Sequence, residues 1–187
     1  VSGTVEVGAT YYVYVTREYT DPSYPATLIG AVAQFTIVGG EIVLQPTEGP
    51  VGTEVEITGT DFSGGESITI EYDNDPVDIA DGDDQTAADG GFVSYVLIPE
   101  STAGVHTLTV TVAGNEVKAE FTVEPEIILS PTSGEAGTEV SVSGTGFGRR
   151  SDVSVYFGNT GVATVTTDSK GSFATTFTVP ELAADIY

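Results

Sequence analysis

Cysteine, methionine and tryptophan are missing from the 187-residue sequence, and basic residues are scarce. Without cysteine, the chain can form no disulfide bond, zinc–thiolate site or thiol nucleophile. Five lysine and arginine residues stand against 28 acidic residues, which gives a formal net charge of −23. Binding to nucleic acid and to anionic membrane surfaces depends on basic side chains. We therefore expect no nucleic-acid partner.

Long apolar runs are also missing. No run approaches the roughly 20 residues that cross a bilayer, so we expect no direct membrane insertion in this stretch. Hydrophobic residues still make up 40% of the sequence, too many for an acidic disordered tail, and the chain should bury a core. Because the sequence starts at Val1 and lacks methionine, we expect it to be a piece of a longer protein.

One 21-residue stretch occurs twice. Residues 42–62 return 85 positions later as residues 127–147, with 12 of 21 positions identical. The correspondence resumes further along, at Phe92 and Phe173, with an offset of 81. The first repeat therefore carries four extra residues in its middle loop. A repeat of this length indicates two copies of one structural unit.

Within each repeat, apolar and polar residues alternate between glycine- and proline-rich turns, which is the pattern of half-buried strands. Seven short strands in about 85 residues are typical of an immunoglobulin-like β-sandwich, so we predict an all-β fold. Gly114 and Asn115 fit a two-residue hairpin turn. Strands are expected near residues 42–45, 54–60, 67–72, 77–80, 92–98, 106–112 and 117–123. The predicted inward side chains are Val55, Ile57, Ile68, Ile70, Tyr72, Phe92, Val96, Ile98, Leu108, Val110, Ala119, Phe121 and Val123.

The repeated motif carries a family resemblance. The string Ile-x-Leu-x-Pro-Thr-x-Gly-x-x-Gly-Thr-Glu-Val, followed by Gly-Thr-x-Phe, resembles the opening of IPT/TIG domains, which are immunoglobulin-like modules of plexins, some transcription factors and many microbial surface proteins. The resemblance covers most of residues 41–187. It implies a sandwich that serves as an extracellular spacer or adhesion module, or as a dimerisation and DNA-contact module. The negative charge argues against contact with DNA.

Both ends of the sequence repeat parts of the same unit. Residues 33–38 resemble residues 119–123, and Tyr11 to Val15 resemble His106 to Val110. The prediction is therefore a row of tandem immunoglobulin-like domains. Residues 1–40 should hold the last strands of a preceding domain as a partial domain or hairpin, residues 41–125 a complete domain, and residues 126–187 a second domain that lacks its last two strands.

A sandwich without two strands exposes apolar side chains and an open strand edge. The N-terminal hairpin of another copy could complete it by head-to-tail strand complementation. Alternatively, the parent chain could supply the missing strands by its own continuation. The expected partners are therefore neighbouring repeats or copies of the same protein.

Aspartates are concentrated around the extra residues of the first repeat. Flexible oxygen-rich loops suit Ca²⁺, although the spacing matches no EF-hand, and a solvated acidic loop has the same composition. We expect no cofactor other than calcium. The calcium candidates are Asp73, Asp75, Asp78, Asp81, Asp83 and Asp84.

Tyrosines gather near the N-terminus, where they could contact a glycan or protein ligand or serve strand packing. These interaction candidates are Tyr11, Tyr12, Tyr14, Tyr19 and Tyr24. His106 is the only histidine, and tyrosine stands at the matching positions Tyr11 and Tyr187. This recurrence favours a structural role for His106, similar to a tyrosine corner.

Three functions fit these features. The first is a non-catalytic structural or adhesive repeat of a large extracellular or cell-surface protein, as a spacer or a surface-layer or filament scaffold. The linkers at residues 38–41 and 123–126 are short, and Pro125 between two glutamates restricts bending in the second, which supports this function. The second is a ligand-recognition domain, with or without calcium. The third is an accessory domain of a secreted hydrolase. With one histidine and no nucleophile motif, the chain is not expected to be an enzyme.

Overall fold

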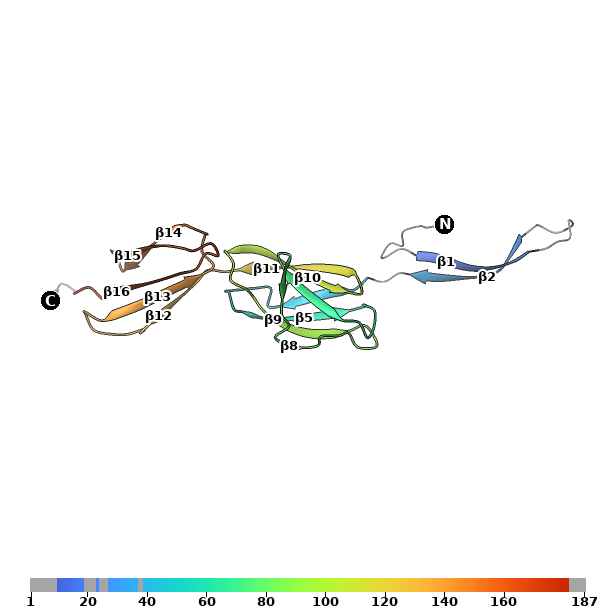
Figure 1. Ribbon diagram of the computed structural model, residues 1–187, viewed down its shortest axis with the longest axis horizontal. Helices are drawn as coiled ribbons and strands as arrows, with labels where there is room; N and C mark the ends of the chain where they lie inside the picture. Colours follow the sequence, from blue (N-terminus) through green and yellow to red (C-terminus); the bar gives the residue numbers. More distant parts are fainter. Residues whose placement is uncertain (1–9, 19–22, 24–26, 37–38, 182–187) are drawn as a thin grey trace.

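The structure is a computed structural model that describes residues 10–18, 23, 27–36 and 39–181 (Figure 1). Within these ranges every regular element is a β-strand, which confirms the predicted all-β class. The described part of the chain contains no helix long and apolar enough to cross a membrane. Figure 1 shows three parts in a row: a hairpin, a first unit over residues 41–125 and a second unit over residues 126–181.

The first unit is a sandwich of two sheets. One sheet has the strand order β4-β11-β10-β6-β7, and the other has the order β3-β5-β9-β8. All neighbours are antiparallel except β4 and β11, which run parallel. The strands are β3 (Glu41–Gln45), β4 (Glu48–Gly49), β5 (Glu54–Thr60), β6 (Ile68–Tyr72), β7 (Asp75–Val77), β8 (Asp81–Gly82), β9 (Phe92–Leu97), β10 (Gly104–Val112) and β11 (Asn115–Val123).

The core of the first unit lies between these two sheets. Strand β5 shows why the sequence alternates: Val55 and Ile57 are buried, while Glu54 and Thr60 at its ends are exposed. Every side chain predicted to face inward is buried except Ala119, which is partly buried against the same cluster. Strands β10 and β11 contribute Leu108, Val110, Val112, Phe121 and Val123 to this core.

Two local predictions are wrong. A single strand over residues 77–80 is replaced by β7, which pairs with β6, and β8, which pairs with β9 in the opposite sheet. The chain changes sheets here while Val77 and Ile79 both keep facing the core. The hairpin turn falls on Ala113 and Gly114, because Val112 pairs with Asn115. Both turn residues have positive φ, 50° and 81°, as a two-residue primed turn requires.

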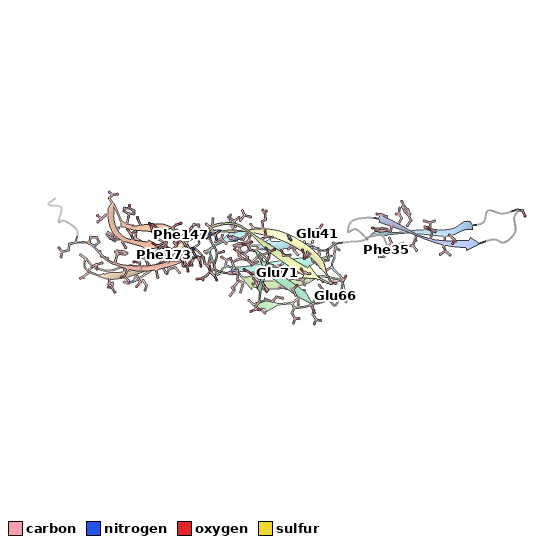
Figure 2. All side chains as sticks on the ribbon, turned by 45° about the horizontal axis from the view of Figure 1, so that its top comes forward. Phe35, Glu41, Glu66, Glu71, Phe147 and Phe173 are labelled. Atoms are coloured by element: carbon pink, nitrogen blue, oxygen red, sulfur yellow. The ribbon has the colours of Figure 1, made fainter. Side chains whose placement is uncertain are left out.

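The second unit repeats only part of this arrangement. Its sheets have the orders β12-β13-β16 and β14-β15. The Phe62–Phe92 ring pair, with centroids 5.6 Å apart, recurs as Phe147–Phe173 at 5.2 Å, and Figure 2 shows the latter two rings together. The strands are β12 (Glu126–Ser130), β13 (Glu139–Thr145), β14 (Asp152–Phe157), β15 (Thr160–Thr166) and β16 (Phe173–Thr178).

A buried threonine holds the same loop in both units, and no motif in the sequence predicts this role. The Thr86 hydroxyl donates to the Ser63 carbonyl at 2.6 Å and accepts from the Glu66 amide at 3.0 Å. In the second unit, the Thr167 hydroxyl donates to the Gly148 carbonyl at 2.6 Å and accepts from the Ser151 amide at 2.9 Å.

The N-terminal hairpin consists of β1 (Thr10–Glu18) and β2 (Thr27–Thr36), which form an antiparallel sheet of their own. Tyr11 pairs with Phe35, and Val13 pairs with Ala33. Figure 2 shows Phe35 on this hairpin, apart from the two units. The assignment of the hairpin to a preceding domain stays a prediction, since the structure describes no other strand before Glu41.

Backbone contacts join the two units directly. The Ala103 amide donates to the Gly146 carbonyl at 2.9 Å, and Thr102 forms a parallel bridge with Gly146. Gly146 has a φ of 74°, and a Cβ there would lie 2.9 Å from the Glu124 carbonyl oxygen. Only glycine fits this position without strain. The junction is therefore a specific contact as well as a short linker.

Candidate interaction surfaces

The second unit has an open apolar face. Residues 126–181 contain counterparts of β3, β5, β6 and β9, and the structure describes no counterpart of β10 or β11 there. In the first unit, β10 pairs with β6 over five residue pairs, Leu108–Tyr72 to Val112–Ile68. The matching edge of β14 has no neighbouring strand among the described residues, since β14 pairs only with β15. It presents backbone groups that another strand can pair with.

The exposed fractions of side chains at equivalent positions of the two units show what β10 and β11 cover in the first unit. Leu44 is 6% exposed, whereas its counterpart Leu129 is 38% exposed. Tyr72 is 5% exposed, whereas its counterpart Phe157 is 38% exposed. Deeper in the second unit, Val142 stays buried. The exposure is therefore concentrated where β10 and β11 would lie, and burying each large side chain is worth roughly 1.5–3 kcal/mol.

A groove of about 330 Å³ occupies this face. In the first unit, Thr47 and Gly49 lie next to β11: the Thr122 amide donates to the Thr47 carbonyl at 2.9 Å, and the Glu124 amide donates to the Gly49 carbonyl at 3.0 Å. Their counterparts in the second unit, Thr132 and Gly134, line the groove. The corresponding segment of the second unit lines one wall of the groove. The lining residues are Ile127, Leu129, Pro131, Thr132, Ser133, Gly134, Val140, Val142, Val155, Tyr156, Phe157, Phe177 and Val179.

The β1–β2 hairpin is the second exposed apolar surface. Tyr12 and Tyr14 on one face, and Val13 and Val15 on the other, are each about 60% exposed or more. A two-stranded hairpin with neither face covered is marginal in water. Of the predicted interaction tyrosines, Tyr11, Tyr12 and Tyr14 lie in β1, whereas Tyr19 and Tyr24 fall outside the described residues.

The predicted calcium residues lie along several loops and short strands. In the part of the chain that the structure describes, no three histidine or acidic side chains are arranged to hold a metal ion. Asp81 and Asp83 cap nearby amides instead: the Gly82 amide donates to Asp81, and the Val93 amide donates to Asp83, both at 2.8 Å. Asp75 lies in β7, and Asp78 and Asp84 lie in the segments around β8. Calcium binding stays a prediction from the sequence.

Asp73 is instead paired with His106. The His106 Nδ1 lies 2.6 Å from an Asp73 carboxylate oxygen, and the Thr107 amide donates to the same carboxylate at 2.9 Å. Burial raises the pKa of Asp73, but these hydrogen bonds lower it by more, so the net pKa lies below its usual value. Asp73 is one of the calcium candidates, and its pairing with His106 was not predicted, because the two residues are 33 positions apart.

The His106 ring also connects to the junction. Its Nε2 lies 2.7 Å from the Thr102 carbonyl, and its ring stacks on Tyr72 with centroids 5.0 Å apart. Burial raises the pKa of Tyr72 to about 12, against the opposing effect of its hydrogen bond with Ser101. Both His106 nitrogens are therefore engaged, one by the Asp73 side chain and one by the backbone of Thr102. The arrangement holds the loop that contacts Gly146 and gives His106 a structural role.

The fold and the repeated core define a protein built from tandem immunoglobulin-like β-sandwich modules. Residues 43–124 and 128–186 match the IPT/TIG domain. The chain belongs to the IPT/TIG family, whose members are generally non-catalytic modules. No curated protein matches the sequence.

Two solved structures are similar to this chain. One is the adhesin InvE of Yersinia pseudotuberculosis, at 15% identity and a TM-score of 0.38, over 75% of this chain and 51% of the adhesin. The other is the full extracellular region of plexin A4, at 15% identity and a TM-score of 0.35, over 93% of this chain and 15% of plexin A4. The chain thus spans about half of the adhesin structure and a small part of plexin A4.

Proposed function

We propose that this chain is a non-catalytic structural and adhesive repeat module of a large extracellular or cell-surface protein. The observation that supports this most is the direct junction between the two units. The hydrogen bond from Ala103 to Gly146, the Thr102 bridge and the glycine-specific geometry at Gly146 connect consecutive sandwiches without a flexible tether. A spacer that holds a binding part at a distance needs such a junction.

The distribution of polar groups supports the same function. His106, the only histidine, is engaged by Asp73 and Thr102, so it is not free to act as a general base. The charge of −23 keeps an extended array soluble and disfavours unspecific association. Membership of the IPT/TIG family, whose modules are generally non-catalytic, fits this assignment.

Assembly with neighbouring copies is part of the same proposal. In this proposal, neighbouring copies of the chain join head to tail at the second unit, and the spacer extends into a surface-layer or filament scaffold. The partner is then another copy of the same protein.

The location can be tested on cells that carry the parent protein. An antibody raised against residues 41–181 should label intact cells as strongly as permeabilised cells, and external protease should remove the signal. Labelling that requires permeabilisation would contradict an extracellular module. Internal deletion of residues 41–125 should then shorten the reach of the parent's outer part without abolishing its surface display, as expected for a spacer.

A further inference from the structure

We infer that the outer face of the β3-β5-β9-β8 sheet binds a basic segment of another protein, which lays lysine or arginine side chains along strand β9. This inference rests on the adhesive part of the proposed function and adds the binding surface and the chemistry of the partner. All four strands of the sheet lie within residues 41–97 of the first unit.

The outward side chains of β9 form an apolar stripe. Strand β9 lies between β5 and β8 in its sheet (Figure 1). Alternate residues of β9 are buried in the core, and the others are Val93, Tyr95 and Leu97. Val93 is 36% exposed, Leu97 is 49% exposed, and Tyr95 is half-buried. Because they stand at every second residue, these three side chains follow one another along the same face of the strand.

Carboxylates lie on both sides of this stripe. On β5, Glu54 pairs with Leu97 and Glu56 pairs with Tyr95. On β8, Asp81 pairs with Tyr95. Directly paired residues place their side chains on the same face of a sheet. The Tyr95 hydroxyl donates to the Glu56 carboxylate at 2.9 Å. This hydrogen bond raises the pKa of Tyr95, and the nearby charges of Asp81 and Glu54 raise it further.

No basic side chain of the first unit balances these carboxylates. Lys118 is the only lysine in residues 41–125, which contain no arginine, and it lies on β11 in the opposite sheet. In the part of the chain that the structure describes, no ion pair involves Glu54, Glu56 or Asp81. The potential at the stripe is therefore negative, and a second copy of the chain, with a charge of −23, is repelled from it. The partner that fits must bring positive charge.

The second unit lacks this surface, although it forms the equivalent strands. The pairing is the same in both, since Glu56 pairs with Tyr95 as Ser141 pairs with Thr176. The residues that correspond to Val93, Tyr95 and Leu97 are Ala174, Thr176 and Thr178. The fold does not require the stripe, because the second unit forms the same pairing without it. The stripe therefore indicates a function that belongs to the first unit.

Lysine and arginine side chains match both properties of this surface. Their methylene groups can lie on the apolar stripe while their charged ends reach the carboxylates beside it. A cation over the Tyr95 ring gains a further attraction. Aliphatic residues of the partner can cover the remaining area of Val93 and Leu97. The partner is therefore a segment rich in lysine or arginine with aliphatic residues between them.

Binding of a fluorescent peptide to the full 187-residue chain tests this inference. The probe is Lys-Lys-Leu-Leu-Lys-Lys-Leu-Leu-Lys-Lys, in which each face of the extended peptide carries both residue types. Fluorescence anisotropy should show saturable binding that weakens with added salt, because opposite charges attract. The same peptide with serine in place of leucine should bind more weakly, and with glutamate in place of lysine it should not bind.

A triple substitution tests the stripe. V93A/Y95T/L97T gives β9 the residues that the second unit has at these positions, where the same strand pairing forms. Because the variant removes apolar contact area, it should weaken peptide binding by about tenfold or more. Leu97→Thr alone should weaken binding about threefold and replaces the triple variant if circular dichroism shows that the first unit has unfolded. Unchanged binding to a folded variant would overturn the inference, because the peptide would then bind elsewhere.

Two matched charge variants test the carboxylates. E54Q/E56Q removes two charges beside the stripe and should weaken binding roughly fivefold, with a smaller dependence on salt. E116Q/E120Q removes two exposed charges from β11 in the opposite sheet and should leave binding unchanged. Equal weakening by both variants would overturn the inference, because the peptide would then respond only to the overall charge. Absence of saturable binding at low salt would also overturn it.

Failure of peptide binding leaves the spacer function standing, since surface labelling of the parent does not depend on this face. Loss of surface labelling, conversely, would remove the extracellular function while the peptide result could still hold.

Discussion

The buried threonine of the first unit allows a sharp test of how its loop is held. Thr86 is 4% exposed, and its hydroxyl bonds the Ser63 carbonyl and the Glu66 amide. Thr86→Val keeps the side-chain shape and removes both hydrogen bonds. Thr86→Ser keeps the hydroxyl and removes one methyl group.

The magnitudes separate the two changes. A hydrogen bond contributes about 0.5–1.5 kcal/mol net, and a partner left without one costs more. Thr86→Val should therefore lower the free energy of unfolding of the first unit by about 2 kcal/mol. A buried methyl group is worth about 0.8 kcal/mol, so Thr86→Ser should cost less. The matched change Thr167→Val should have a similar effect on the second unit, because its two hydrogen bonds are equivalent.

Urea unfolding followed by circular dichroism can measure these changes, with Thr86→Val shifting the transition of the first unit and Thr167→Val that of the second. The midpoint should move while the dependence on urea stays constant, since the surface exposed on unfolding does not change. If Thr86→Ser destabilised the first unit more than Thr86→Val, packing of the methyl group would be what matters, and the hydrogen-bond reasoning would be refuted.

Three further predictions concern the first unit. The pKa of Asp73 lies below its usual 3.8, so ionised Asp73 stabilises the folded state above pH 3.8, and this stabilisation is lost as the pH falls through the lowered pKa. Asp73→Asn removes this effect, so the melting temperature should fall less steeply with decreasing pH in the variant. An equally steep fall in both proteins would contradict this. Phe121→Ala, at a fully buried position, should lower the free energy of unfolding by about 3–5 kcal/mol in chemical denaturation, with the second unit unaffected. Calcium should raise the melting temperature no more than magnesium at equal ionic strength, because the described carboxylates form no three-ligand group; a calcium-specific rise would instead favour the site predicted from the sequence.

The core of the first unit could be predicted from the sequence because alternation reports directly on burial. Val55 and Ile57 alternate with more polar residues along β5, so the pattern alone indicates that they face inward. The repeat shows the same alternation at Val140 and Val142. The change of sheet after Val77 could not be predicted in this way. Val77 and Ile79 both face the core, although the backbone leaves its pairing with β6 and begins to pair with β9. The alternation of side chains reports which residues face inward and does not report which strand lies beside them.

Local conformation and long-range pairing account for the other differences. The turn at Ala113 requires a positive φ that alanine rarely adopts, so the sequence favoured Gly114 and Asn115 instead. The sequence predicted a structural role for His106 but not its partner Asp73 or its link to the junction through Thr102, since these depend on how β6 and β10 are brought together. The comparison of calcium with magnesium above tests the predicted aspartates.

The parallel pairing of β4 with β11 has a mechanical consequence for a spacer. A pull on the chain enters the first unit at Glu41 and leaves it beyond Val123, so it drags these two strands past each other along their length. The bonds from Thr122 to Thr47 and from Glu124 to Gly49 then share the load in shear and must break together. The first unit should therefore keep its length under a pull along the chain until both bonds break at the same time.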